Sequence, residues 1–186
     1  MKIILMRHGQ TDYNLAGVYM GRMLDASINE TGKVQMEQTI PELQSLKPEV
    51  IISSPMKRTR ESAEIIGNAL EIPIEFDDRI TEIDIGSLSG KSKAGASSLM
   101  NLSLEAAIQQ YRMGQYDYSP FGGESAKDIL ERTERFLKGL KQRKEKCIVI
   151  MSHGGLVRSL HGVITGNLSL VDKGIANAAL IVLEYV

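Results

Sequence analysis

The chain has little of what marks secreted, disulfide-bonded or membrane proteins. Its 186 residues include one cysteine and no tryptophan. A single cysteine, Cys147, cannot form an intramolecular disulfide, and the apolar run around it indicates a buried core residue in a reducing compartment. The first apolar run, residues 3–6, is too short for the core of a signal peptide, and no later run approaches a membrane span. These absences predict a cytoplasmic protein that does not associate with membranes.

An excess of charge of either sign is also lacking. The chain has 22 basic and 23 acidic residues, which gives a formal net charge of -1. No overall field therefore favours nucleic acid or anionic lipid as a partner, and any site for an anion must be built locally. The three histidines have neither metal-ligand spacing nor partner cysteines, so we assign no metal and no cofactor. The chain length predicts a single domain over residues 1–186.

Short apolar runs alternate with helical patterns along the chain. They predict strands at residues 2–6, 50–53, 72–76, 147–151 and 180–185, and helices at residues 30–46, 56–70, 125–143 and 156–164. Pro41 should kink the first helix, and Ser125 with Asp128 forms a capping pair for the third. Most of the strands are apolar throughout, which indicates burial on both faces. We predict an α/β fold, a three-layer helix-sheet-helix sandwich with a mostly parallel sheet.

Residues 87–123 interrupt this alternation. Residues 87–98 are rich in serine, glycine and other small residues without a helical period, so we expect a mobile loop there. Residues 102–118 are helical in composition, and Gly122 with Gly123 breaks any regular element that follows. Insertions of this kind often cover an active site. We therefore predict that residues 87–123 form such a cover.

The first predicted strand runs into a segment that suits a phosphate group, residues 7–11 (RHGQT), with Asn14 nearby. The planar guanidinium of Arg7 can hold two phosphate oxygens, and the neutral imidazole of His8 is nucleophilic near pH 7. Gln10 and Thr11 add neutral hydrogen-bonding groups. Taken alone, the segment equally fits a charged strand end at the surface.

Two more segments follow predicted strands and lead toward the same edge of the sheet. Residues 152–155 (SHGG) repeat the histidine–glycine pair, and residues 53–60 (SSPMKRTR) begin a helix. We expect Arg58 or Arg60 to face His8. An arginine in the first turn of a helix opposes the helix dipole, so a bound anion explains it better than helix stability does.

Glu82 and Asp84 are the candidates for a proton donor. They lie among isoleucines in residues 79–86 (RITEIDIG), where an extended chain passes into a loop. A carboxyl group buried among apolar residues can keep its proton and donate it near neutrality. These residues alone do not decide between the two. The third histidine, His161, is interpreted as a packed structural residue of an apolar helix.

In their order along the chain, these segments resemble the histidine phosphatase superfamily, also called the phosphoglycerate mutase-like family, and the match spans nearly the whole chain. The resemblance implies that His8 is the phosphorylated nucleophile and Glu82 the proton donor. It further implies a set of residues that contact the phosphoryl group or the substrate: Arg7, Arg58 and His153 as a clamp, with Asn14, Gln10, Thr11 and the backbone at Gly21 and Gly154.

The resemblance implies a metal-independent phosphomonoester hydrolase that acts on a small phosphorylated metabolite through a phosphohistidine. Two arginines and a protonated His153 would offset the phosphoryl charge without magnesium. Two alternatives remain: a phosphoglycerate mutase, and a catalytically idle module that binds a phospho-ligand. We favour hydrolysis over mutase activity because the predicted cover is brief and has only Lys91, Lys93 and Arg112 as cations. The natural substrate and the oligomeric state, with a homodimer as one alternative, are left open.

Overall fold

The computed structural model describes residues 1–103, 105–106, 109–110, 117–167 and 174–186. Its centre is a five-stranded sheet in the order β3-β2-β4-β1-β5. The strands are β1 (Lys2–Arg7), β2 (Val50–Ser53), β3 (Ile74–Phe76), β4 (Cys147–Ser152) and β5 (Leu180–Glu184). The first four pair in parallel, and β5 pairs antiparallel with β1. The mostly parallel sheet expected from the sequence is confirmed.

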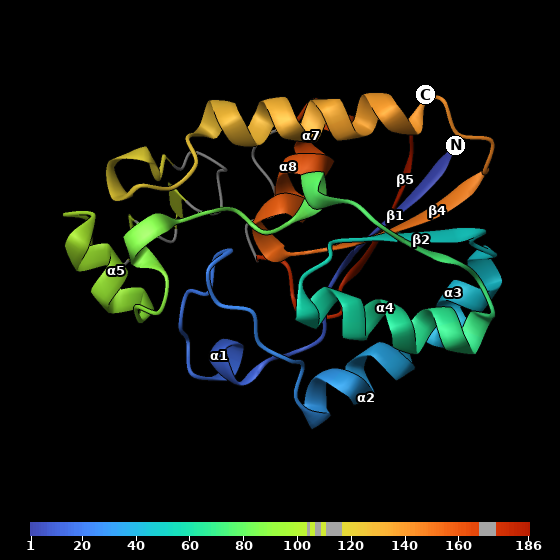
Figure 1. Cartoon of the computed structure of the whole chain (residues 1–186), viewed down its shortest axis with the longest axis horizontal. Helices are drawn as coiled ribbons and strands as arrows, with labels where there is room; N and C mark the ends of the chain where they lie inside the picture. The colour runs from blue at the N-terminus through green and yellow to red at the C-terminus, as the bar shows by residue number, and fades with distance from the viewer. Residues whose placement is uncertain (104, 107–108, 111–116, 168–173) are drawn as a thin grey trace.

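Helices cover both faces of the sheet, which gives three layers (Figure 1). One face carries α7 (Ala126–Leu140) and α8 (Gly154–Thr165). The other carries α2 (Glu30–Gln38), α3 (Ile40–Leu46) and α4 (Lys57–Leu70). The described helices also include two short ones, α1 (Asp12–Leu15) and α5 (Lys93–Leu99). The predicted helix-sheet-helix sandwich is therefore confirmed.

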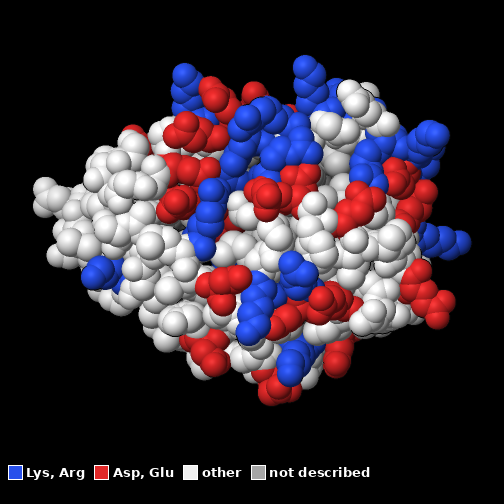
Figure 2. Space-filling view, in the orientation of Figure 1, with Lys and Arg blue, Asp and Glu red and all other residues white. Residues whose placement is uncertain are grey.

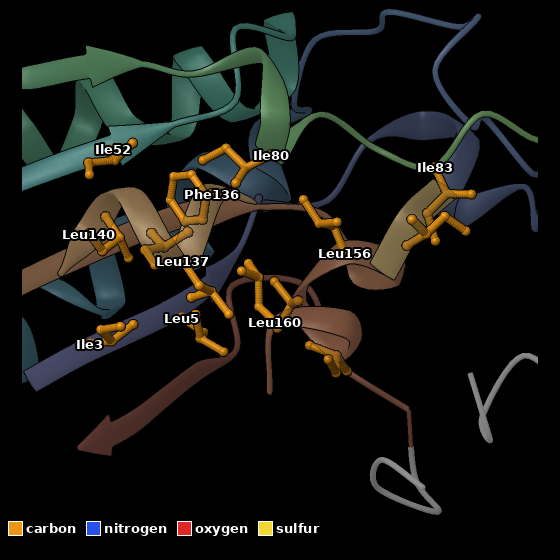
Figure 3. Packing of buried hydrophobic residues seen from close by; sticks show 14 of the residues in the cluster. Ile3, Leu5, Ile52, Ile80, Ile83, Phe136, Leu137, Leu140, Leu156 and Leu160 are labelled. Carbon is orange, nitrogen blue, oxygen red and sulfur yellow. The ribbon is translucent and has the colours of Figure 1, made fainter. Parts of the chain in front are cut away.

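Successive residues of the central strands point to opposite layers, and both sides are buried. In β1, Ile3 and Leu5 pack toward α7 and α8, whereas Ile4 and Met6 pack toward α2, α3 and α4. Figure 3 shows Ile3 and Leu5 in the first of these cores, together with Phe136 from α7. Burial on both sides explains why the strands are apolar throughout instead of alternating.

Local sequence fixes where several helices begin. The Ser125 side chain accepts a hydrogen bond from the Asp128 backbone, and the Asp128 carboxylate accepts from the Ser125 backbone, so the predicted capping pair starts α7. The single kinked helix predicted for residues 30–46 is instead two helices. They separate at Thr39, and Pro41 lies in the first turn of α3, where its missing N–H costs nothing.

The loop predicted for residues 87–98 is wrong. Gly86–Leu88 forms a turn of 3-10 helix, and α5 follows because the Ser92 hydroxyl accepts a hydrogen bond from the Gly95 N–H at 3.1 Å. The helix expected at residues 102–118 lies partly outside the described residues. Whether residues 87–123 close over a bound substrate remains a prediction.

The face of the molecule drawn in Figure 2 has no dominant charge. Figure 2 shows basic and acidic side chains interspersed over one face of the molecule, with mostly uncharged residues near α5. A site for an anion therefore depends on local cations, as the balanced composition suggests. None of the described helices has both the length and the hydrophobicity needed to cross a bilayer.

Candidate active site

A cavity of 610 Å³ opens where the parallel strands end. Arg7 and His8 reach it from the end of β1, Arg58 from the first turn of α4, and Glu82 from the segment after β3. Gly155 contributes backbone from the first turn of α8. Residues far apart in the sequence meet here because the carboxyl ends of parallel strands share one edge of the sheet.

The register of the sheet brings the two histidines together. Arg7 of β1 lies opposite Ser152 of β4, so His8 and His153 leave neighbouring strands at the same level. The His8 backbone N–H donates to the Ser152 carbonyl at 3.0 Å. The ring centroids lie 5.4 Å apart with the ring planes at 62°. The repeated histidine–glycine pair therefore forms one site.

His8 is held as a neutral imidazole with a defined tautomer. Its Nδ1 lies 2.7 Å from the Gly9 carbonyl oxygen, which can only accept, so Nδ1 carries the proton and Nε2 carries the lone pair. Burial lowers the pKa of His8 well below its ordinary value, and the charges of Arg7 and Arg58 lower it further. The lone pair of Nε2 is therefore available at neutral pH.

Arg58 is fully buried and anchored by three acceptors. Its Nη1 donates to the Leu24 carbonyl at 2.9 Å, its Nη2 to the Gly21 carbonyl at 3.0 Å, and its Nε to His153 Nδ1 at 3.1 Å. Arg60, the alternative that the sequence left open, instead stacks over the Phe76 ring at 4.4 Å. The geometry therefore brings Arg58, and not Arg60, to His8.

The structure does not support the expectation of a protonated His153. Nδ1 accepts from Arg58 Nε, so it has no proton, and the proton at Nε2 points to the Ser54 hydroxyl oxygen at 2.8 Å. Burial lowers the pKa of His153 well below its ordinary value, and Arg58 is the next cause. His153 lies behind the cavity wall and contacts it through Arg58.

Arg7 is tied to the segment that precedes β5. Its Nη1 donates to the Ile175 carbonyl at 2.6 Å, and Ile175 also lines the cavity. Asn177, two residues further on, donates from Nδ2 to Asn14 Oδ1 at 3.0 Å. Both asparagines line the cavity. Nothing in the sequence around Asn177 signals this position, because the long separation from Asn14 is bridged only in the folded chain.

Glu82 lies against the start of α8. Its Oε1 accepts from the Ile83 N–H at 3.0 Å. A Cβ atom on Gly155 would lie 2.8 Å from the same oxygen, so a larger residue there would displace the Glu82 carboxyl group. Asp84 does not line the cavity, and its carboxylate accepts from the Gly86 N–H at 2.9 Å. The structure therefore brings Glu82, and not Asp84, to His8 and Arg58.

A charged network holds the backbone of Glu82. The Arg132 guanidinium donates to the carbonyls of Arg79 and Thr81 at 2.8 and 3.0 Å, and its Nε donates to Glu124 Oε1 at 2.6 Å. Arg22 donates from Nε to the Glu82 carbonyl at 3.2 Å and from Nη2 to Glu124 Oε2 at 3.2 Å. Glu124 thus links two arginines that both bind the segment carrying Glu82.

The remaining predicted contacts divide into two groups. Gly21 lines the cavity, as Asn14 does. The other three predicted contacts do not line it. The Gln10 side chain accepts a hydrogen bond from Asn29, the Thr11 hydroxyl caps α1, and Gly154 is buried at the start of α8.

Residues 87–123, the predicted cover, contribute Lys93 and Tyr118 to the wall. Among the residues that the structure describes, no group of three acidic, histidine or cysteine side chains could hold a metal ion.

Comparison with known proteins shows which family the chain belongs to. A family model described as the histidine phosphatase superfamily (branch 1) matches residues 3–186. Phosphoserine phosphatase 1 of Hydrogenobacter thermophilus is 30% identical over 167 residues, which cover 89% of this chain and 77% of the relative. A metal-independent phosphoserine phosphatase of Arabidopsis thaliana is 31% identical over 170 residues, which cover 88% of this chain and 68% of the relative.

A solved structure shows the same fold. The mycobacterial glucosyl-3-phosphoglycerate phosphatase in complex with VO3 superposes with a TM-score of 0.83 at 25% identity, covering 98% of this chain and 90% of the other. The family model spans almost the entire sequence, and the similar proteins carry phosphatase names. The chain belongs to the histidine phosphatase superfamily (branch 1).

Proposed function

We propose that this phosphatase hydrolyses the phosphomonoester of a small metabolite without a metal ion, through a phosphohistidine formed on His8. One observation carries the proposal: the Gly9 carbonyl holds the proton on Nδ1 of a buried, neutral His8, which leaves the Nε2 lone pair for attack. A neutral nitrogen beside two fixed cations, Arg7 and Arg58, is suited to attack a phosphorus atom whose oxygens those cations bind.

In the first step, the Nε2 lone pair of His8 forms the bond to phosphorus while the bond from phosphorus to the ester oxygen breaks. Glu82 gives its proton to the departing oxygen, so an alcohol leaves. In the second step, the Glu82 carboxylate takes a proton from water as the water oxygen bonds to phosphorus. The bond between phosphorus and Nε2 breaks, its electron pair returns to His8, and phosphate leaves.

Arg7 and Arg58 supply the charge that the phosphoryl oxygens require. In the first step they neutralise the dianion, a task that many phosphoryl-transfer enzymes give to magnesium. A neutral His153 fits a different role from the protonated clamp expected at first. It accepts from Arg58 Nε and so orients this guanidinium toward the cavity. The Arabidopsis relative, named as metal-independent, supports the absence of a metal from the proposed reaction.

The names of the relatives indicate a broad class of substrate and no single compound. Their names include phosphoserine phosphatase and glucosyl-3-phosphoglycerate phosphatase. Both substrates are phosphate esters of small hydroxy compounds, and a cavity of 610 Å³ has room for a metabolite of that size. We therefore place the substrate of this chain among small phosphorylated metabolites.

A panel of phosphorylated metabolites tests the proposal against its two alternatives. With 3-phosphoglycerate, with and without 2,3-bisphosphoglycerate, both free phosphate and 2-phosphoglycerate are followed. The proposal predicts phosphate release from members of the panel without isomer formation. Isomerisation much faster than phosphate release would identify a mutase. Tight binding of phosphate esters with neither product would identify a binding module.

A further inference from the structure

The segment before β5 runs beside the end of β1. The Arg7 N–H donates to the Ala179 carbonyl at 3.1 Å, and the Ala178 N–H donates to the His8 carbonyl at 3.1 Å. These two hydrogen bonds continue the antiparallel pairing of β1 with β5 beyond the ends of both strands. The next residue of the segment, Asn177, therefore lies beside His8 and lines the cavity.

The amide of Asn177 has one orientation that satisfies its neighbours. Its Nδ2 lies 3.2 Å from the His8 carbonyl oxygen, which can only accept, so this position belongs to the nitrogen of the amide and not to its oxygen. The same nitrogen donates to Asn14 Oδ1 at 3.0 Å. The two hydrogens of Asn177 Nδ2 thus match two acceptors.

The amide of Asn14 is fixed in turn. Its Oδ1 accepts from the Thr11 backbone N–H at 3.2 Å, a group that can only donate, and from Asn177 Nδ2. Within the part of the chain that the structure describes, Asn14 Nδ2 donates to no other residue. Asn14 lines the cavity together with His8, so its N–H groups remain for a bound ligand.

Packing does not hold the Asn14 side chain in place. Asn14 belongs to α1, which has four residues and none of them buried. The Thr11 N–H restrains Asn14 from the start of the same short helix. Asn177 comes instead from a segment that is bonded to the central sheet, so it ties Asn14 to the part of the molecule that carries His8.

The backbone beside Asn177 has an uncommon conformation. Ala178 has a φ of 58°, in the left-handed region that residues with a side chain seldom adopt. In this turn the Ala178 N–H and Asn177 Nδ2 both donate to the His8 carbonyl. Such conformations persist where the surrounding contacts hold them, and they are concentrated at functional sites.

We infer that Asn177 is a positioning residue, which holds the Asn14 amide with its N–H groups toward the phosphoryl oxygens and its own oxygen away from them. This inference rests on the proposed function, in which the cavity binds a phosphoryl group. The oxygens of a phosphoryl dianion can only accept, so they require donors. A reversed Asn14 amide would bring a second acceptor against them and weaken binding.

A double-mutant cycle tests the inference with p-nitrophenyl phosphate, whose leaving group needs no proton, so that kcat/KM reports contacts to the phosphoryl group. Asn14→Ala should lower kcat/KM about a hundredfold, as expected when a hydrogen bond to a charged group is lost. Asn177→Ala should lower it about tenfold. The double variant should lose about a hundredfold, no more than Asn14→Ala alone, because Asn177 then has no amide to orient.

Two further variants control for size, charge and folding. Asn177→Asp keeps the size of the side chain and removes both donors, so it should lose at least as much as Asn177→Ala. Any loss that Asn177→Asp still causes in the Asn14→Ala background measures repulsion between the new charge and the phosphate. Asn68→Ala changes an exposed asparagine of α4 outside the cavity wall and should keep the wild-type kcat/KM. Circular dichroism reports whether each variant is folded.

Nuclear magnetic resonance reads the Asn14 amide without relying on turnover. In the wild-type chain without ligand, ¹⁵N relaxation should give the Asn14 side-chain amide the high order parameter of a rigid group. Asn177→Ala should lower this order parameter, and Asn68→Ala should leave it unchanged.

The outcomes separate this inference from the proposed function. Full activity of Asn177→Ala would overturn the inference and leave the hydrolase standing. Equal losses from Asn177→Ala in the wild-type and Asn14→Ala backgrounds would overturn it too, since Asn177 would then act on the backbone at His8 and not through Asn14. If no ester is turned over, the proposed function fails, and the order parameter decides alone: an unchanged value in Asn177→Ala would refute the role of Asn177.

Discussion

Mild acid should destabilise the folded chain because two buried histidines stay neutral when the chain is folded and take up protons when it unfolds. His8 and His153 are 1% and 0% exposed, and burial is the main cause of the lowered pKa of each. In the unfolded chain both titrate near pH 6.5. Below that pH the unfolded chain binds protons that the folded chain does not, so stability present above it is lost as the pH falls.

The size of the effect follows from proton linkage. A histidine that stays neutral in the folded chain costs roughly 1.4 kcal/mol between pH 7.5 and pH 5.5, so the two together cost about 2.7 kcal/mol. That is a large part of the roughly 5–15 kcal/mol that usually separates folded from unfolded domains. Carboxylates with lowered pKa values, such as Asp128, lose their contribution only at more acidic pH.

Urea unfolding at pH 7.5 and pH 5.5 measures this loss. The buffer must contain no phosphate, because an anion bound in the site would stabilise the folded chain. His8→Gln should lose about half of the pH dependence. His161→Gln, which changes a partly exposed histidine outside the site, should keep most of it. An unchanged free energy of unfolding between the two pH values, or the same pH dependence in His8→Gln as in the wild type, would refute the neutral, buried histidines.

Three further predictions address the proposed chemistry. Glu82→Gln should lose far more of the phosphorylation rate on alkyl phosphates than on p-nitrophenyl phosphate, whose leaving group needs no proton, whereas equal losses would assign Glu82 a structural role. Glu124→Gln should lower kcat on alkyl phosphates about tenfold with a smaller change in KM, because it weakens the network of hydrogen bonds that positions Glu82. The control Glu134→Gln, at the exposed face of α7, should leave both constants unchanged. Treatment with EDTA should leave the rate unchanged, and restoration of a lost rate by an added divalent cation would contradict the role given to the two arginines.

The layers of the fold were predictable because the central strands β1, β2 and β4 are buried on both sides and helices such as α4 and α7 are amphipathic. Residues 147–152 are apolar up to Ser152, and this run became the central strand β4. The short helix α5 escaped prediction because its only local signal is the Ser92 cap, and its small residues show no period. Long, continuous patterns therefore specified the layers, whereas short elements depended on single hydrogen bonds.

The residues of the site that directly follow a strand could be predicted from the sequence. The residues that reach the cavity from other elements could not. His8 follows β1 directly, so its place at the sheet edge could be inferred. Three residues of the cavity wall come from places that no pattern in the sequence indicates. They are Lys93 from α5, Arg158 from α8 and Asn177 from the segment before β5. The neutral state of His153 follows from one hydrogen bond, in which Arg58 Nε donates to His153 Nδ1. The sequence does not show this bond because the two residues meet only in the folded chain.

Trapping the phosphoenzyme tests the central claim most directly. The chain is mixed with a ³²P-labelled ester, quenched rapidly without acid, and digested to locate the label. The account predicts one acid-labile, alkali-stable phosphoryl group per chain on His8, and none in His8→Ala. Label that persists in His8→Ala, or that resides on His153, would contradict it.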